Sequence, residues 1–219
     1  MIPYKDDNPA ETFPFVTIGI VVLNVLAFIA EYLNPGGMKY VVYKYGAIPS
    51  EMLSFRIGAI LNVFYSMFLH GGFFHIAGNM LYLWIFGNNI EDRLGHLRFA
   101  VFYLLCGVVA AFGHALSAPS ASIPMIGASG AISGILGAYL LLYPHAKVHT
   151  LIFFGFFVQI VRLPAVFVIG FWAVIQLVNA IISKGMLNQG GGVAWFAHIG
   201  GFLFGLIMIR FWIPKRRPS

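Results

Sequence analysis

Charged side chains are scarce in this sequence, and this scarcity is its most informative feature. Only 9% of the 219 residues are charged, whereas 60% are hydrophobic. About a quarter of the residues of a soluble globular domain are charged. Water therefore cannot be the main solvent of this chain, and the composition predicts an integral membrane protein.

Carboxylates are missing from the whole second half of the chain. All seven acidic residues precede position 93, namely Asp6, Asp7, Glu11, Glu31, Glu51, Glu91 and Asp92. There is no His-Glu-x-x-His helix of a zinc protease, and no pair of aspartates for an aspartyl protease. The carboxylate relay of a proton-coupled carrier and the arginine row of a voltage sensor are also missing. We therefore expect no metal and no cofactor, and a function that depends on neutral polar side chains.

Cysteine is limited to Cys106, which excludes an intrachain disulfide and is expected to pack in the core. A basic n-region and a small-residue cleavage site are missing from the N-terminal segment, so the first apolar run is expected to be a retained span. No Arg-rich transit sequence is found there. This favours the plasma membrane of a prokaryote as the location.

Six apolar segments are long enough to be membrane spans, because a bilayer core needs about 20 apolar residues per helix. They run approximately over residues 15–32, 74–90, 97–116, 128–143, 164–183 and 193–212. The predicted fold is thus all-α, a polytopic bundle of six transmembrane helices with a long outer first loop over residues 34–73. Short interfacial helices are expected over 57–69, and a short interfacial hairpin over 148–161.

The chain is expected to form a single membrane domain over residues 1–219, with a short polar segment at about 1–14 and a basic tail at about 213–219. Lys and Arg are concentrated on the side of the two termini, and the other side has only Lys39, Lys44, Arg56 and Lys184. The positive-inside rule therefore places both termini in the cytoplasm. The lipid bilayer explains the basic tail, so nucleic acid is not needed as a partner. The sequence does not give the oligomeric state.

The first motif that could support chemistry is Gly127-Ala128-Ser129-Gly130, at the start of the fourth span. A serine in the first turn of a helix lies beside free backbone N–H groups and the positive end of the helix dipole, which can stabilise an oxyanion. The flanking Gly127 and Gly130 let a substrate backbone approach. Helix packing is the structural alternative, because small residues are common at membrane helix interfaces.

A nucleophilic serine needs a base, and the sixth span contains His198. Gly201 and Gly205 form a strip of small residues on the same helix, and the fourth span has matching glycines at Gly130, Gly134 and Gly137. Such strips let two helices approach closely, so we expect a hydrogen bond between Ser129 and His198. Because no carboxylate is available at that depth, a Ser-His dyad is expected rather than a triad. Considered alone, His198 is better explained as a packing histidine.

The third motif is His70-Gly-Gly-Phe-Phe-His75-Ile-Ala-Gly-Asn79, which enters the second span from the same outer face. His75 and Asn79 are four residues apart and share a helix face. Both can donate hydrogen bonds to a developing oxyanion. His70 is expected to hold the loop in place.

These three motifs, in this order on the second, fourth and sixth of six spans, resemble those of the rhomboid intramembrane serine proteases, and the match covers nearly the whole chain. The resemblance implies that Ser129 is the nucleophile and His198 its base, with His75, Asn79 and the Ser129 backbone as the oxyanion hole. It also implies transmembrane proteins as substrates, cut near the outer face of the membrane. Structural roles are implied for Glu91 and Arg93 at the cytoplasmic end of the second span.

Two positions depart from well-known bacterial members of that family. Those proteins have a tyrosine, stacked on the histidine, one helical turn after the serine, and here that position is Ser133. The residue that orients His198 is therefore open. The outer loop also lacks their Trp-Arg pair. A gate is expected at the fifth span, through Phe167, Phe171 and Trp172 packed against the second span, with Gly190 to Gly192 as a hinge.

Two other functions compete with proteolysis. An inactive rhomboid-like protein that binds and escorts membrane clients is the main alternative, although such relatives usually lack the serine or the histidine. A haem protein that uses His75, His114 or His198 as axial ligands is a remote second possibility.

Overall fold

Six long helices account for most of the fold in the computed structural model, which describes residues 1–155, 157–184 and 194–214. Their bounds are α1 Phe15–Tyr32, α5 Phe73–Leu94, α6 His96–Ser117, α7 Ser129–Leu142, α8 Ala165–Lys184 and α9 Trp195–Trp212. A helix is thus present at each of the six predicted positions. Within the described residues, α1, α6, α8 and α9 are long and apolar enough to cross a membrane. The other two differ, because α5 includes more polar side chains and α7 has only 14 residues.

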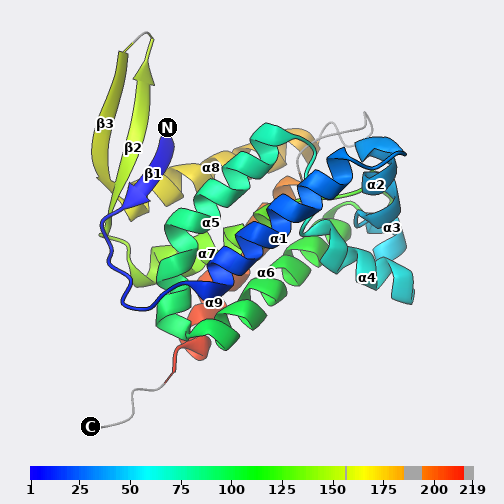
Figure 1. The fold of residues 1–219 in the computed structure, drawn as a ribbon, viewed down its shortest axis with the longest axis horizontal. Helices are drawn as coiled ribbons and strands as arrows, with labels where there is room; N and C mark the ends of the chain where they lie inside the picture. Colours follow the sequence, from blue (N-terminus) through cyan, green and yellow to red (C-terminus); the bar gives the residue numbers. More distant parts are fainter. Residues whose placement is uncertain (156, 185–193, 215–219) are drawn as a thin grey trace.

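The segment between α1 and α5 is folded rather than extended. It forms α2 Gly37–Tyr45, α3 Pro49–Met52 and α4 Ile57–Ser66, and the last of these falls within the predicted range 57–69. All three lie at one end of the bundle (Figure 1). The Ser66 carbonyl accepts a 2.8 Å hydrogen bond from the Gly127 N–H, so this segment contacts the chain just before α7.

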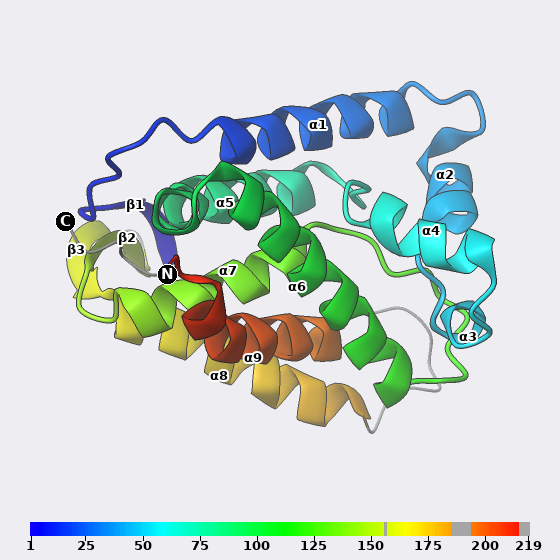
Figure 2. The same cartoon turned by 90° about the horizontal axis from the view of Figure 1, so that it is seen from below.

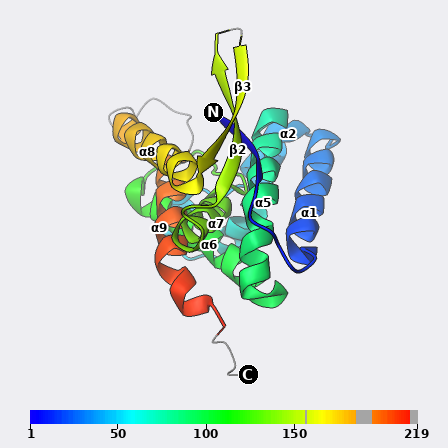
Figure 3. The same cartoon turned by 90° about the vertical axis from the view of Figure 1, so that its left-hand side faces the viewer.

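The all-α prediction is wrong at the opposite end of the bundle, where the chain forms a three-stranded antiparallel sheet. Its strands are β1 Ile2–Asp6, β2 Lys147–Phe154 and β3 Phe157–Pro164, in the order β1-β2-β3. The hairpin expected over 148–161 is present as β2 and β3, and it projects beyond the helices (Figures 1 and 3). The five residues of β1, predicted to be a polar segment, instead pair with β2 between Ile2–Leu151 and Asp6–Val148.

Asp6 connects this sheet to the helices. Its Oδ2 accepts hydrogen bonds from the Tyr139 hydroxyl of α7 at 2.6 Å and from the Asn89 side-chain amide of α5 at 3.0 Å. Burial raises the pKa of the Asp6 carboxyl. The first residues of the chain are therefore attached to the interior of the protein.

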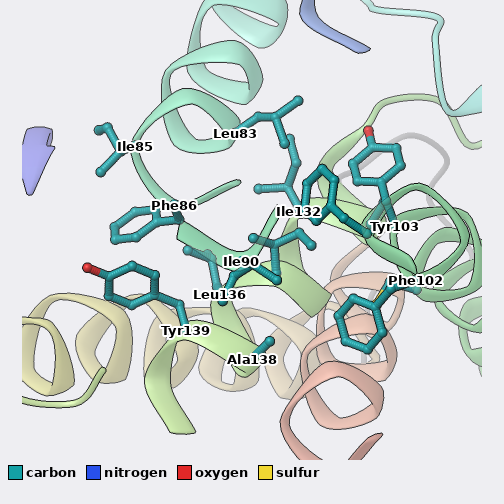
Figure 4. Close-up of a cluster of buried hydrophobic side chains, with 14 of the residues drawn as sticks. Leu83, Ile85, Phe86, Ile90, Phe102, Tyr103, Ile132, Leu136, Ala138 and Tyr139 are labelled. Atoms are coloured by element: carbon teal, nitrogen blue, oxygen red, sulfur yellow. The ribbon is translucent and has the colours of Figure 1, made fainter. Parts of the chain in front are cut away.

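Helix α7 lies inside the bundle, with α5, α6 and α9 around it (Figures 2 and 3). All nine residues from Ala131 to Tyr139 are buried. Their side chains meet Phe86 and Ile90 of α5 and Phe102 and Tyr103 of α6 in the main apolar core (Figure 4). A helix that is apolar on every side is suited to such an interior position.

Glycines bring the backbones of α7 and α9 into direct contact. A Cβ atom at position 205 would lie 1.9 Å from the carbonyl oxygen of Gly134, and one at position 201 would lie 2.1 Å from that of Gly130. A Cβ at position 137 would lie 2.2 Å from the carbonyl oxygen of Phe202. No side chain fits at these positions, so the glycine strips set the distance between the two helices.

Glu91 holds the start of α1 against α5. Its carboxylate accepts hydrogen bonds from the N–H groups of Val16 at 2.9 Å and Thr17 at 2.7 Å, and from the Thr17 hydroxyl at 2.7 Å. His96 Nδ1 lies 2.6 Å from the same group. The carboxylate is fully buried and satisfies N–H groups that the first turn of α1 cannot pair internally.

Replacing Gly205 by alanine should destabilise the bundle, because the new methyl group would overlap the Gly134 backbone. Gly19→Ala in α1 is the matched control, since no atom lies within 4 Å of its added Cβ. We expect a lower thermal unfolding temperature in detergent for Gly205→Ala, and an unchanged or higher one for Gly19→Ala, where alanine is the better helix former by about 1 kcal/mol. Equal unfolding temperatures for the two variants would contradict the close contact.

Glu91→Gln should cost at least about 2 kcal/mol of stability, because an amide loses the charge that strengthens the hydrogen bonds and presents N–H groups to other donors. The measurement is chemical or thermal unfolding in detergent. Glu11→Gln is the control, because Glu11 is exposed. If both variants unfolded like the original protein, Glu91 would have no structural role of the kind described here.

Candidate active site

Ser129 is the first residue of α7. The N-terminal end of this helix lies inside the bundle and points towards α2, α3 and α4 (Figure 2). Ser129 is half-buried. As the opening residues of a helix, Ser129 and Gly130 have N–H groups for which no preceding turn provides a carbonyl. The hydroxyl thus lies beside backbone donors and the positive end of the helix dipole.

His198 lies in the first turns of α9, and its Nε2 is 2.8 Å from Ser129 Oγ. This is the contact that the glycine strips predicted. The ring is buried, with 9% of its surface exposed. Trp195 lies edge-on to it, with ring centroids 6.0 Å apart.

The other ring nitrogen of His198 has a partner that the sequence analysis missed. Nδ1 lies 2.7 Å from Oε1 of Gln176, a buried residue of α8. Ser133, one helical turn after Ser129, donates its hydroxyl to the Ser129 carbonyl at 2.6 Å and has no hydrogen bond to His198 among the described residues. A polar residue in the middle of a predicted span was the available signal for Gln176, since such residues are costly in a membrane.

His75 and Asn79, both on α5, lie next to the chain that leads into α7. A Cβ at position 127 would be 2.8 Å from His75 Nε2 and 3.5 Å from Asn79 Nδ2. The Gly71 N–H donates to His75 Nδ1 at 3.3 Å. Because Nδ1 accepts this bond, the proton of the neutral ring belongs on Nε2. His75 therefore presents an N–H donor on the side where Gly127 and Ser129 lie.

His70 holds the Asn79 side chain in place through a hydrogen bond. Its Nε2 lies 2.9 Å from Asn79 Nδ2, and its Nδ1 lies 3.2 Å from the Phe68 carbonyl. The carbonyl can only accept, so Nδ1 donates and Nε2 accepts one of the two amide hydrogens of Asn79. Burial, together with the nearby His75, lowers the pKa of His70 to about 4. The ring is therefore neutral at neutral pH, as its role as an acceptor requires.

Gly127 shapes the backbone at this point. Its φ of +116° lies in a region that side chains disfavour, and His75 leaves no room for a Cβ. A cavity of about 40 Å³ adjoins it, lined among others by Ser66, Ser129 and Ala197. This is space for at least one water molecule.

The expected gate is only partly described. Phe167 and Phe171 of α8 are 64% and 51% exposed on the outside of the bundle rather than enclosed against α5. Trp172 packs against α9, with its ring centroid 6.1 Å from that of His198 and 6.0 Å from that of Phe202. The expected hinge at 190–192 lies outside the described residues.

Comparisons with known proteins all point to one family. A family model described as "Rhomboid domain" matches residues 58–215. The chain is 30% identical over 151 residues to "Rhomboid protein 1, mitochondrial" of Saccharomyces cerevisiae, covering 67% of this chain and 40% of that protein. It is 32% identical over 148 residues to "Presenilin-associated rhomboid-like protein, mitochondrial" of Mus musculus, covering 67% and 36%. The match to "RHOMBOID-like protein 1" of Arabidopsis thaliana is 27% over 225 residues, covering 90% and 52%. The chain thus spans between about a third and a half of the length of these curated relatives.

Gly127→Ala should impair this site, because the left-handed conformation costs an alanine about 1–2 kcal/mol and the methyl group would overlap His75. We expect the rate at which a fluorophosphonate labels Ser129 to fall at least about tenfold. Gly78→Ala is the control, since its Cβ would have no neighbour within 4 Å although it lies beside Asn79. Equal labelling rates would show that the Gly127 conformation does not matter for the serine.

Proposed function

The chain belongs to the rhomboid family, and on this premise we propose that it is an intramembrane serine endopeptidase that cuts transmembrane segments of other membrane proteins. Ser129 is the nucleophile and His198 the base. The observation that carries the proposal is the 2.8 Å contact between Ser129 Oγ and His198 Nε2, made by two helices whose glycines permit it.

The reaction follows from the arrangement of donors and acceptors. His198 Nε2 takes the proton of the Ser129 hydroxyl as Oγ attacks a peptide carbonyl of the substrate. The negative charge that forms on the carbonyl oxygen is stabilised by the Ser129 N–H, the Asn79 amide and the Nε2–H of His75. His198 then gives the proton to the leaving amine, so that an acyl-enzyme ester and a free amine result. Water, deprotonated by the same nitrogen, hydrolyses the ester and restores Ser129.

The length of α7 explains how hydrolysis and a bilayer are combined. Its 14 residues span about 21 Å, which is less than the apolar thickness of about 30 Å. If the C-terminal end of α7 lies at the cytoplasmic surface, its first residue, Ser129, lies below the outer surface, on the side of the segment formed by α2, α3 and α4. The cavity beside Gly127 and Ser129 leaves space for a water molecule at this depth.

The protein is a multi-pass membrane protein, and our proposal adds its topology. All six long helices cross the bilayer as one domain over residues 1–219, both termini are cytoplasmic, and the location is the plasma membrane of a prokaryote. The basic residues at the sheet end of the bundle and in the tail support this orientation.

Substrates are expected to be single-span proteins with a weak helix near the outer face. Freeing backbone groups in hydrocarbon costs several kcal/mol each, so Gly, Pro or small residues near the cut should be preferred. Entry is expected between α8 and α5. The substrate helix would pack against the exposed side chains of Phe167 and Phe171, where lipid packs when no substrate is bound.

The test is cleavage of a single-span substrate in liposomes, with the product termini mapped by mass spectrometry. Ser129→Ala and His198→Ala should abolish cleavage, and Asn79→Ala should lower kcat by about 10²–10³. Ser54→Ala and His145→Ala are matched controls, because both residues are exposed and distant in sequence from the site motifs.

Undiminished cleavage by Ser129→Ala would sink the proposal. A wild-type protein that binds many single-span proteins but cuts none of them would instead support the client-binding alternative. Cuts in soluble loops alone would remove the intramembrane part of the proposal.

A further inference from the structure

Gln176 is an unusual residue for its helix. Most side chains of α8 near it are apolar and exposed, as are Val174 at 59%, Leu177 at 50% and Phe171 at 51%, whereas Gln176 is 6% exposed and faces α9. Burying an amide is costly unless its groups are hydrogen-bonded. The oxygen and the nitrogen of this amide must therefore each find at least one hydrogen-bond partner inside the protein.

Both bonds are present, and together they fix which end of the amide meets His198. Oε1 lies 2.7 Å from His198 Nδ1, while Nε2 donates to the Trp172 carbonyl at 3.3 Å. If the amide were turned over, its oxygen would face the Trp172 carbonyl, and two acceptors would meet. The amide oxygen therefore belongs at His198.

This orientation determines the protonation of the imidazole. An amide oxygen can only accept, so Nδ1 of the neutral ring carries the proton. Nε2 is then left with a free lone pair, and it is this atom that lies 2.8 Å from Ser129 Oγ. The opposite tautomer would put an N–H in front of Ser129 and could not take its proton.

Resting on the function proposed above, we propose that Gln176 is a positioning residue that holds His198 in the tautomer and orientation needed for it to act as a base. Trp172, one turn earlier on α8, packs against the same ring. Because both residues belong to α8, an outward displacement of that helix takes the acceptor away from His198. The position of α8 is thereby coupled to the reactivity of Ser129.

A neutral amide suits this position better than a carboxylate. A carboxylate at Nδ1 would have to be taken out of water into a buried site, which costs several kcal/mol before any interaction with the imidazole. The amide accepts the same hydrogen bond without a charge. The chain has no acidic residue after Asp92, and Gln176 lies beside Nδ1, where the aspartate of a Ser-His-Asp triad would lie, so the Ser129–His198 dyad has a neutral partner there.

The test compares Gln176→Leu, which has similar size and no acceptor, with Gln176→Glu, which keeps an acceptor oxygen. We expect kcat to fall about 10- to 100-fold in Gln176→Leu with KM changed less than about twofold. Gln176→Glu should recover part of the lost kcat, because it keeps an acceptor oxygen at Nδ1, and should unfold at a lower temperature, because its carboxylate is buried. Asn179→Leu is the matched control, because it removes an amide from the same helix and has no hydrogen bond to His198 in the described part of the chain. Thermal unfolding of each variant separates lost orientation from lost folding.

The tautomer is read directly by ¹⁵N NMR of histidine-labelled protein, which needs no turnover. We expect His198 to be protonated at Nδ1 in the original protein and in Ser129→Ala, and to shift towards the Nε2-protonated form in Gln176→Leu. An active enzyme in which Gln176→Leu keeps its kcat, or whose His198 is protonated at Nε2, would overturn this inference while leaving the proposed function intact. Absence of cleavage by the original protein would count against the proposed function, and the NMR result would still decide the role of Gln176.

Discussion

The proposed active site depends on how closely α7 and α9 approach each other. Between helices in lipid there is no hydrophobic driving force, so association depends on van der Waals contact and interhelical hydrogen bonds, for which small residues are needed. Ser129 has a short side chain and can reach an imidazole on another helix only if the backbones nearly touch. The glycines at 130, 134, 137, 201 and 205 provide that distance. Serine and histidine contribute the chemistry, while residues without side chains contribute the geometry.

The two ends of the bundle are built differently. At the sheet end, charged and polar groups join separate elements: Glu91 joins α5 to α1, and Asp6 joins β1 to α5 and α7. At the other end, around Ser129, the side chains of His198, Gln176, His70 and Asn79 form hydrogen bonds without a charged partner, and one buried carboxyl group, that of Glu31, accepts the His70 N–H at 2.9 Å. The hydrogen bonds of Asp6 to Asn89 and Tyr139 fix the position of α5 along α7. This position places His75 and Asn79 opposite the start of α7.

The sequence allowed the six helix positions to be predicted, together with the proximity of Ser129 and His198, because both leave strong local signals. Apolar runs define helices in a membrane, and the few polar residues within them stand out. The Ser129–His198 contact could be anticipated from the matching glycine spacing of the two spans, combined with the need of a nucleophilic serine for a base. Strand β1 could not, since five residues with two charges resemble a polar tail until β2 is there to pair with. The Gln176 contact joins residues 22 positions apart through side-chain orientation, which no periodic pattern encodes. The prediction for Phe167 and Phe171 differed from the structure because an aromatic residue on a membrane helix can face lipid as well as protein.

At His198 and His75, the hydrogen-bond partner of Nδ1 determines which ring nitrogen carries the proton. At His198 the partner is an acceptor, the Gln176 oxygen, so the proton is on Nδ1 and Nε2 is free to take a proton. At His75 the partner is a donor, the Gly71 N–H, so the proton is on Nε2. One ring therefore presents a lone pair to Ser129, and the other presents an N–H on the side of the same serine. In the proposed mechanism, one residue type thus provides both the base and an oxyanion donor without a buried charge, which suits a site surrounded by hydrocarbon.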